Sequence, residues 1–312
     1  MKGLELAERF YLEYGEPMLR EFPELLPYIA VGLVGSGSEC LGFDDELSRD
    51  HDFEAGFCIF IPDEDKIDSR SVFALERAYA RLPKEYMGYA RVGLVPADGK
   101  RHGVIRISDL LERKTGRRDG ELVLSDWLTL PEQNLLELTN GRIFFDGSGK
   151  ITRIRNNLSY LPEDVRRKKL AGELILMGQA GQYNYSRCIA RGETAAAQLA
   201  ACEFVKSALH VIFIINRRYL PYYKWTFRAL TELPIFSELH TPLEYLISST
   251  NTADEAKIKK EMIESICAKI VAEIKSQNLS DFSGTALEGH AFSANEKIST
   301  PELRALHILA AV

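Results

Sequence analysis

The sequence predicts an α+β protein, in which helices and strands alternate through the first half and helices alone make up the second. Short apolar runs that are typical of buried strands are concentrated before residue 162. Beyond it, Ala-rich and Leu-rich stretches repeat their apolar positions at helical spacing, and little strand signal remains. A chain of 312 residues is also long enough for two domains. We therefore expect a sheet-containing domain over 1–150 and a helical domain over 151–312.

Apolar periodicity and proline or glycine stops define the elements of the first half. In chain order, we expect helix over the first thirty residues, interrupted by Pro23 and Pro27, a strand at 30–34, a strand at 53–61, a helix at 69–82, and strands at 91–95 and 103–107. The boundary between the domains is expected between Asn140 and Pro162.

The second half is expected to contain helices at 163–180, 193–216, 224–233 and 255–276. The last of these carries apolar residues at steps of four, which predict its buried stripe: Ile258, Met262, Ile266, Ile270 and Ile274. A Ser-, Gly- and Asn-rich loop is expected over 280–299. After it, Thr300 and Pro301 predict the start of a last helix.

The composition is that of a globular protein, with 46% hydrophobic and 27% charged residues. A net charge of −6 does not favour electrostatic binding of nucleic acid or of an anionic membrane over a broad surface, so neither is expected as a partner. No run of 18 apolar residues occurs, and acidic residues stand where a secretory signal would be apolar. A cytoplasmic location and reduced, unpaired cysteines are therefore expected.

A glycine- and serine-rich turn follows the first predicted strand, with the sequence Gly35-Ser36-Gly37-Ser38. Glycines let a backbone approach an anion closely, and such a turn can present several N–H groups to a phosphate. The same residues also suit an ordinary tight turn. The turn alone leaves these alternatives open.

Two aspartates, Asp50 and Asp52, stand at the start of the second predicted strand. Residues two apart in a strand project to the same face, and neighbouring carboxylates repel each other unless a cation lies between them. Mg²⁺ commonly takes one or two carboxylates together with substrate phosphates. Singly, the aspartates equally suit a solvated loop. Their conjunction with the turn, with thirteen residues between Ser36 and Asp50, favours a metal-dependent nucleoside triphosphate site.

This pattern resembles that of the DNA polymerase beta-like nucleotidyltransferase superfamily, which includes antibiotic nucleotidyltransferases such as kanamycin nucleotidyltransferase. The pattern consists of an apolar strand, Gly-Ser, a gap of about a dozen residues, and Asp-x-Asp before a second strand. The strings GSGSECLGFDDELSRDHDF, LPEQNLLELTNGRIFFD, RIRNNLSYLPEDV and NRRYLPYYKW resemble a bacterial branch known only as a domain of unknown function, across most of 30–235. The resemblance implies that Gly35 and Ser36 hold the triphosphate and that Asp50 and Asp52 ligate two metal ions. It also implies a short, mixed, twisted sheet flanked by helices, then a helical domain that helps to form a cleft.

The sequence departs from the superfamily at one point that matters for catalysis. Catalytic members usually carry a third carboxylate on a later strand, and the matching strand at 103–107 has none. Asp98 and Asp109 flank this strand, but the sequence assigns neither of them to the site. General-base help is typically worth about 10²- to 10⁴-fold in rate, so its loss would leave binding without efficient transfer.

Further residues join the candidate set with alternatives left open. Ser38 lies in the turn, and Arg49 either contacts phosphate or pairs with an acidic neighbour at 44–45. His51, between the aspartates, is expected to face the other way and pack. In the string NRRYLPYYKW, Lys224 is expected to contact phosphate and Tyr219 to line the cleft; the alternative is a helix corner with solvated cations.

The predicted function is Mg²⁺-dependent transfer of a nucleoside monophosphate from an NTP to a hydroxyl of a small-molecule acceptor. The alternative is a nucleotide-binding regulator or catalytically inactive relative, which the missing carboxylate favours. A nucleotidyltransferase that acts on RNA or on a protein is a third possibility, against which the acidic charge balance argues.

Overall fold

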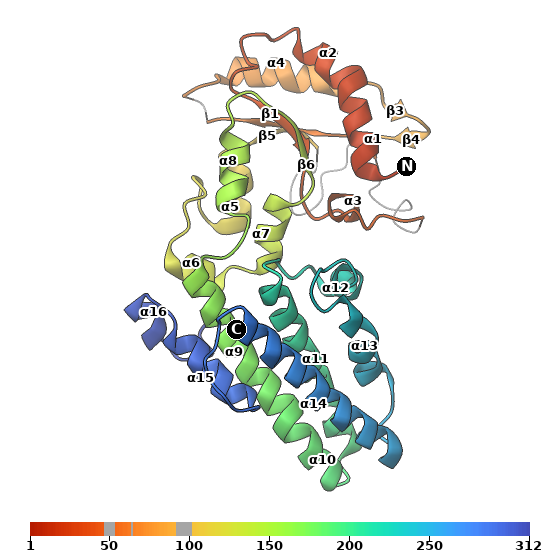
Figure 1. The fold of residues 1–312 in the computed structure, drawn as a ribbon. Coiled ribbons are helices and arrows are strands. Elements are labelled where there is room, and N and C mark those ends of the chain that lie inside the picture. The colour runs from red at the N-terminus through yellow and green to blue at the C-terminus, as the bar shows by residue number, and fades with distance from the viewer. Residues whose placement is uncertain (47–53, 64, 92–101) are drawn as a thin grey trace. The chain divides into compact units, whose positions relative to one another are not determined.

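The computed structural model describes residues 1–46, 54–63, 65–91 and 102–312 (Figure 1). The chain divides into two compact units. One comprises 1–123 and 130–159, and the other comprises 124–129 and 160–312. The protein is α+β and mainly helical, with one small mixed sheet.

The first unit contains the sheet and the helices that cover it. Its helices are α1 (Gly3–Phe10), the π-helix η1 (Tyr11–Gly15), α2 (Glu16–Leu19), α3 (Ser38–Leu41), α4 (Ser69–Ala80), α5 (Ile107–Thr115), α7 (Glu132–Thr139) and α8 (Lys150–Asn157). Its strands are β1 (Ala30–Leu33), β2 (Cys58–Ile61), β3 (Glu85–Tyr86), β4 (Tyr89–Ala90), β5 (Gly103–Arg106) and β6 (Arg142–Asp146). Strands β3 and β4 form a separate small hairpin.

The main sheet has the strand order β5-β2-β1-β6. Strand β1 is antiparallel to both β2 and β6, and β2 is parallel to β5, as Gly32 opposite Cys58 and Cys58 opposite Gly103 illustrate. A register shift between Val31 and Gly32 interrupts the pairing of β1 with β6. The sheet is therefore mixed, with β1 and β2 at its centre.

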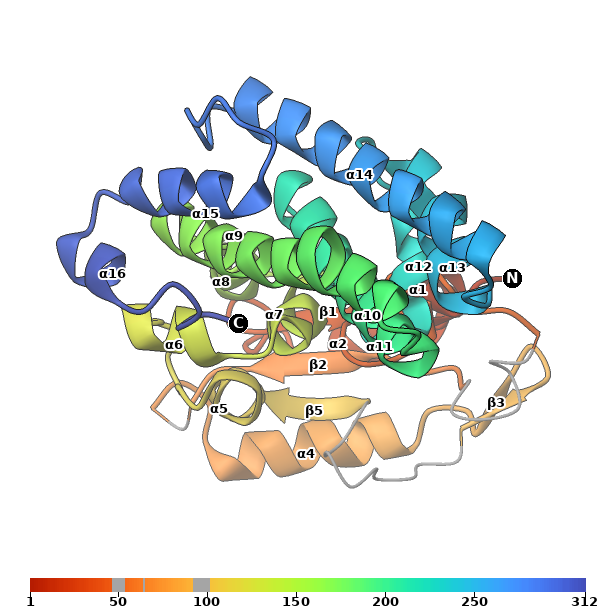
Figure 2. The ribbon, with the colours of Figure 1, turned by 90° about the horizontal axis from the view of Figure 1, so that it is seen from below.

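One face of the sheet is covered by α1, η1 and α4. Phe10 and Tyr11 pack there against Phe57, and Leu75 of α4 belongs to the same core. Figure 2 shows α4 beside β5, an arrangement that their contacts confirm. Successive strand residues alternate between faces, so the burial of Phe60 shows that the opposite face is covered as well. The sheet is thus an interior layer of this unit.

The predicted strands and helices of the first half are largely confirmed, with three corrections. The first helix does not continue to residue 30: helical structure ends at Leu19 and turns follow to Tyr28. The second strand is shorter than predicted, since 54–57 are not in the ladder. In place of a strand at 91–95, the short strand Tyr89–Ala90 ends before Arg91, and 92–95 lie outside the described residues.

The second unit consists of helices and the segments that connect them, with no strand among its described residues. Its elements are α6 (Leu124–Thr129), α9 (Glu163–Met177), the π-helix η3 (Gly178–Tyr185), α10 (Ser186–Ala190), α11 (Thr194–Ile215), α12 (Tyr223–Leu230), the 3₁₀ helix η4 (Ser237–Leu239), α13 (His240–Ser248), α14 (Ala253–Ser276), α15 (Leu287–Glu296) and α16 (Pro301–Ala305). Helix α9 packs against α11 and α15, and α14 contacts η3, α11 and α15. The four predicted helices of this half are confirmed.

Within the described residues, α11 is the one helix long and apolar enough to cross a membrane by length and composition, with a mean hydropathy of 1.6. Yet 61% of its most apolar window is buried against other parts of the structure. Its apolar residues, such as Phe204 and Ile212, belong to the core of the helical unit. The core therefore accounts for the hydropathy of α11.

In the second half, one expectation is wrong and another is confirmed only in part. The stretch 280–299 is not a continuous loop, because Leu287–Glu296 forms α15 and buries Leu287, His290, Ala291 and Ala294 at helical spacing. The predicted stripe of α14 is only partly buried, since Ile258 is 46% exposed. Steps of four advance about 40° further than whole turns of 3.6 residues, so such a stripe drifts around the helix.

The last helix begins at Pro301, as predicted, with Thr300 at the cap position. The Thr300 hydroxyl, however, does not cap the helix. It donates to Asp164 Oδ2 over 2.8 Å, and the N–H groups of Ser299 and Thr300 donate to the same carboxylate. This threonine therefore ties the C-terminal segment to the start of α9.

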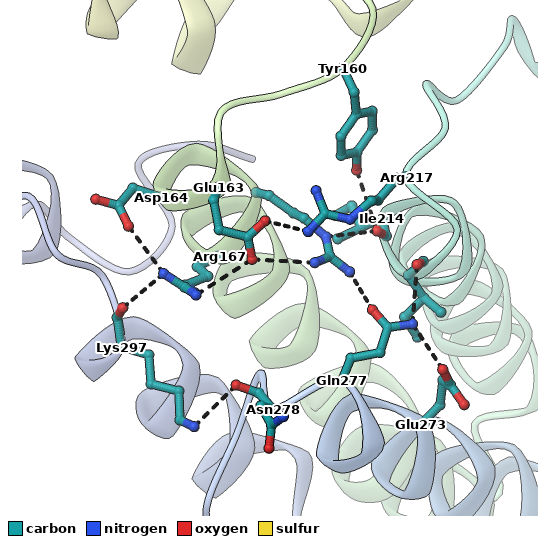
Figure 3. Close-up of polar contacts among 12 residues, drawn as sticks. Tyr160, Glu163, Asp164, Arg167, Ile214, Arg217, Glu273, Gln277, Asn278 and Lys297 are labelled. Carbon is teal, nitrogen blue, oxygen red and sulfur yellow. Dashed lines mark hydrogen bonds and ion pairs between the residues drawn. The ribbon is translucent and has the colours of Figure 1, made fainter.

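A buried polar network closes the end of α11 (Figure 3). Arg166 is 2% exposed, and its Nε donates to the Ile214 carbonyl over 3.0 Å. Its two terminal nitrogens donate to Glu163 Oε1 over 3.3 Å and to Gln277 Oε1 over 2.5 Å. Gln277 in turn donates to the Ile215 carbonyl over 3.3 Å. Carbonyls at a helix C-terminus have no partner within the helix, so these side chains satisfy them in the interior.

We expect Arg166→Ala to lower the free energy of unfolding of the helical unit by about 3 kcal/mol, because it removes a donor from the buried Ile214 carbonyl and from Gln277 Oε1. Both tryptophans of the chain, Trp127 and Trp225, belong to this unit, so urea unfolding followed by intrinsic fluorescence reports on it.

The matched control is Arg217→Ala. Arg217 bonds the same Glu163 over 2.6 Å but its side chain is 55% exposed, so its loss should cost less than about 1 kcal/mol. Equal losses in the two variants would contradict the capping role of Arg166.

Candidate functional site

One edge of the main sheet gathers segments that lie far apart in the sequence. Since β1 is antiparallel to β2 and β6, its C-terminal end lies beside their N-terminal ends, and β5 starts there too. The segments attached at this edge are the turn 35–38, residues 54–57, His102 and the pair 140–141. We treat this edge as the candidate functional site.

The turn after β1 depends on glycine at its first position. Gly35 has φ +130°, a conformation that side-chain-bearing residues rarely adopt. Its N–H donates to Asn140 Oδ1 over 3.0 Å, and its carbonyl accepts from Asn140 Nδ2 over 2.7 Å. The amide of one side chain thus holds both backbone groups of Gly35.

The next three residues present unpaired backbone donors. Within the described part of the chain, the N–H groups of Ser36, Gly37 and Ser38 have no hydrogen-bond acceptor, and the two serine hydroxyls have no partner either. Ser36 is exposed, and Gly37 and Ser38 are half-buried. Successive unpaired amides on a glycine-rich turn are typical of an anion-binding concavity.

Arg155 of α8 lies behind Asn140. Its Nη2 donates to the carbonyls of Thr139 over 2.9 Å and Asn140 over 2.8 Å. Its Nη1 is buried and has no hydrogen-bond partner, and Arg155 forms no ion pair with any described carboxylate. Burial lowers the pKa of Arg155, and nearby Cys40 opposes that shift. The half-buried guanidinium is thus a positive charge without a counter-ion at this edge.

The residue after Asn140 must be glycine for β6 to reach β1. Gly141 has φ +62°, and a Cβ on it would lie 2.0 Å from the carbonyl oxygen of Leu33. Its N–H donates to the Cys40 carbonyl over 2.9 Å. The close approach places Asn140 beside Gly35, so the turn and the start of β6 form one unit.

Glu54 and His102 meet at the same edge. Glu54 Oε1 lies 2.7 Å from His102 Nδ1, and the His102 side chain is 10% exposed. Its Nε2 is buried and without a hydrogen-bond partner among the described residues. A Cβ on Gly56 would approach the imidazole ring within 2.7 Å, so this glycine makes room for the ring. The carboxylate orients the ring and favours the proton on Nδ1.

Asp44 anchors the segment that follows the turn. It is buried and accepts from the Gly3 N–H at the start of α1 over 2.8 Å, while Lys2 Nζ lies 3.5 Å from its carboxylate. The position of an acidic side chain at a helix N-terminus is electrostatically favourable. Asp44 therefore contacts the N-terminal segment through Gly3 and Lys2. The suggested pairing of Asp44 or Asp45 with Arg49 stays a prediction, because Arg49 lies outside the described residues.

The structure brings together only some of the predicted site residues. Gly35, Ser36 and Ser38 lie together in the turn. Arg49, Asp50 and Asp52 lie outside the described residues, as do His51 and Asp98. Among the residues that are described, no three His, Cys, Asp or Glu side chains gather in a group that could hold a metal ion.

The remaining two predicted residues belong to the helical unit. Tyr219 is 4% exposed and its ring packs 5.5 Å from that of Tyr160. Lys224 is exposed near the start of α12, and its Nζ lies 5.1 Å from the ring centre of Trp225. Tyr222 and Tyr223 are exposed beside it. The aromatic-cationic surface of the NRRYLPYYKW string is thus formed by Lys224 and its neighbours, whereas Tyr219 is part of the interior.

Sequence analysis missed four residues of this edge: Glu54, His102, Asn140 and Arg155. The Asn140-Gly141 dipeptide is a turn signal before β6, but it carries no information that its side chain reaches a glycine 105 residues earlier. The pairing of Glu54 with His102, 48 residues apart, is likewise a product of strand order. No local pattern identifies such contacts.

The model of a protein family matches residues 127–226, and its description is Domain of unknown function (DUF4037). The match agrees with the part of the sequence resemblance that points to a domain of unknown function. It contains Asn140 and Arg155 of the candidate site and the NRRYLPYYKW string, and it begins after the turn at 35–38. No curated protein matches the chain.

We expect Gly56→Ala to destabilise the protein by about 1–3 kcal/mol, because the added methyl group would displace the His102 ring and break its contact with Glu54. Urea unfolding followed by circular dichroism measures the change. In the His102→Ala background the same substitution should cost much less, since the obstructing ring is gone. Identical costs in both backgrounds would contradict the proposed packing.

Proposed function

We propose that this protein binds a magnesium-nucleoside triphosphate at the sheet edge and transfers the nucleoside monophosphate to a hydroxyl of a small-molecule acceptor. The observation that carries the proposal is the turn at 35–38, whose three unpaired backbone N–H groups lie at the end of a central strand. Such donors suit the closely spaced oxygens of a polyphosphate. The uncompensated charge of Arg155 supports the choice of an anionic ligand.

The metal ligands in this proposal are Asp50 and Asp52. They stand four and two residues before Glu54, which is attached at the same edge as the turn. Two adjacent carboxylates and a triphosphate supply the oxygen ligands that Mg²⁺ prefers. The ion would neutralise charge that develops as the bond between the α- and β-phosphates breaks.

The resemblance to the nucleotidyltransferase superfamily supports the same assignment. The resemblance rests on three features: the Gly-Ser turn, the spacing from it to Asp-x-Asp, and a small mixed sheet flanked by helices. The first unit has such a sheet. A mixed sheet with helices serves many functions, so the turn and the aspartates, rather than the sheet, carry the argument.

A nucleotide-binding regulator is the second candidate. The observation that favours it is the sequence of β5, Gly103–Arg106, which carries no carboxylate to act as a base toward the acceptor. The two candidates differ in one measurable product. Incubation of the purified protein with each labelled NTP, Mg²⁺ and a cell metabolite extract should release pyrophosphate if the protein is an enzyme, and binding without release would favour the regulator.

We expect the parent protein to bind ATP or another NTP with Mg²⁺, and the Asp50→Asn, Asp52→Asn double variant to lose this binding. Loss of one residue that only supports a metal ligand already costs roughly 10- to 100-fold in affinity, so loss of both ligands should cost at least roughly 100-fold. Isothermal calorimetry with and without Mg²⁺ measures it. His51→Ala is the control and should bind as the parent does; equal affinity in the double variant would refute the metal role.

The sequence also assigns Lys224 to the triphosphate, since a cation would balance phosphate charge that the backbone amides and Mg²⁺ leave over, and this assignment has its own test. Lys224→Ala should weaken ATP binding by roughly 10- to 100-fold, the worth of a charge-assisted hydrogen bond, while adenosine binding changes little. Lys260→Ala, which removes another exposed lysine of the same unit, is the control. If ATP and adenosine weaken alike, or neither does, the NRRYLPYYKW string is structural.

A further inference from the structure

Arg155 stands out at the sheet edge because its charge has no counter-ion among the described residues. Buried or half-buried cations normally pair with carboxylates, since an isolated charge in a medium of low dielectric is costly. Arg155 instead bonds two backbone carbonyls, and its Nη1 is buried without a partner. Among the described residues, no carboxylate pairs with this charge, so an anionic ligand is a candidate partner.

The contacts connect this charge to the turn through a single residue. The Arg155 guanidinium donates to the Asn140 carbonyl, and the Asn140 side chain bonds both the N–H and the carbonyl of Gly35. The three residues that follow Gly35 are those with unpaired N–H groups. Hydrogen bonds on both sides of Asn140 therefore connect the cation to Gly35, the first residue of the turn.

We propose that Asn140 and Arg155 are positioning residues of the triphosphate site: Asn140 holds Gly35 in the conformation that presents the next three amides, and Arg155 holds Asn140 and supplies positive potential behind them. The proposal rests on the proposed function and names the residues that select a polyphosphate over an uncharged ligand. Neither residue needs to touch the nucleotide.

A purely structural role is the competing explanation for Arg155. Thr139 and Asn140 stand at the C-terminal end of α7, and an arginine that bonds the last carbonyls of a helix stabilises it without any ligand. That role predicts a loss of stability and equal effects on all ligands. The positioning role predicts a selective loss for charged ligands, because a charge on the order of 10 Å from a phosphate, at an effective dielectric constant of about 20, changes affinity by roughly tenfold.

The test compares calorimetric affinities for MgATP, tripolyphosphate and adenosine across three variants and two matched controls. Arg155→Met should weaken MgATP and tripolyphosphate by roughly tenfold or more and adenosine by less than about twofold. Arg155→Lys retains the charge and should recover most of the loss. Asn140→Asp keeps an acceptor for the Gly35 N–H but adds a negative charge, so it should show the same selective loss. The matched controls Arg153→Met and Asn157→Asp make the same charge changes at exposed positions of α8 and should bind as the parent does.

Hydrogen exchange tests the turn without any ligand. Asn140→Ala should raise the exchange rate of the Gly35 amide at least tenfold, because this N–H donates to the Asn140 side chain in the parent. An unchanged rate would overturn the role of Asn140 whatever the protein binds.

The outcomes separate the inference from the proposed function. If the parent binds MgATP and the variants lose affinity for all three ligands alike, or for none, the inference is wrong and the proposed function stands. If the parent binds neither MgATP nor tripolyphosphate, the proposed function fails, and the ligand-selecting role of Arg155 fails with it. A selective loss that Arg155→Lys repairs establishes the positioning role.

Discussion

The pairing of β1 with β6 is the constraint on which the candidate site depends. It brings a strand near residue 30 beside one near residue 143 and requires glycine at 32 and 141, where a Cβ would lie 2.5 and 2.0 Å from backbone oxygens of the partner strand. Without this close approach, the Asn140 amide would not reach Gly35. Two glycines that look unremarkable in the sequence thus set the conformation of a turn that neither of them belongs to.

In each unit, an arginine side chain bonds carbonyls at the C-terminal end of a helix, but the surrounding charges differ. In the helical unit, Arg166 and Gln277 close the C-terminal carbonyls of α11, and Glu163 supplies a compensating charge. In the sheet unit, Arg155 closes the carbonyls at the end of α7 with no carboxylate beside it among the described residues. In the first network the arginine is thus paired with a carboxylate. In the second network, Arg155 instead bonds the carbonyl of Asn140, whose side chain bonds Gly35 at the start of the turn.

The chemistry proposed for this edge depends on two kinds of groups. The turn and Arg155 provide donors and positive charge, which suit phosphate binding and do not by themselves transfer anything. Transfer additionally needs the metal that Asp50 and Asp52 are proposed to hold and a group that accepts the hydroxyl proton. Strand β5 offers no carboxylate for the latter, and His102, oriented by Glu54, is the titratable side chain at its start. Binding and catalysis are accordingly separate questions for this protein.

The sequence by itself determined the features that depend on neighbours along the chain. The strand before Gly35, the amphipathic helix 69–80 and the helices after residue 162 follow from local periodicity and from proline and glycine stops, and all are present. Helix α15 was missed because its polar composition resembles a loop, whereas its four buried residues stabilise it only through packing against α9. Only the tertiary structure decided that Asn140 clamps Gly35, that Glu54 meets His102 and that Tyr219 is interior while Lys224 is exposed. These contacts join residues 48 to 105 positions apart or depend on which helix face is covered, and strand order and packing, not local spacing, set them.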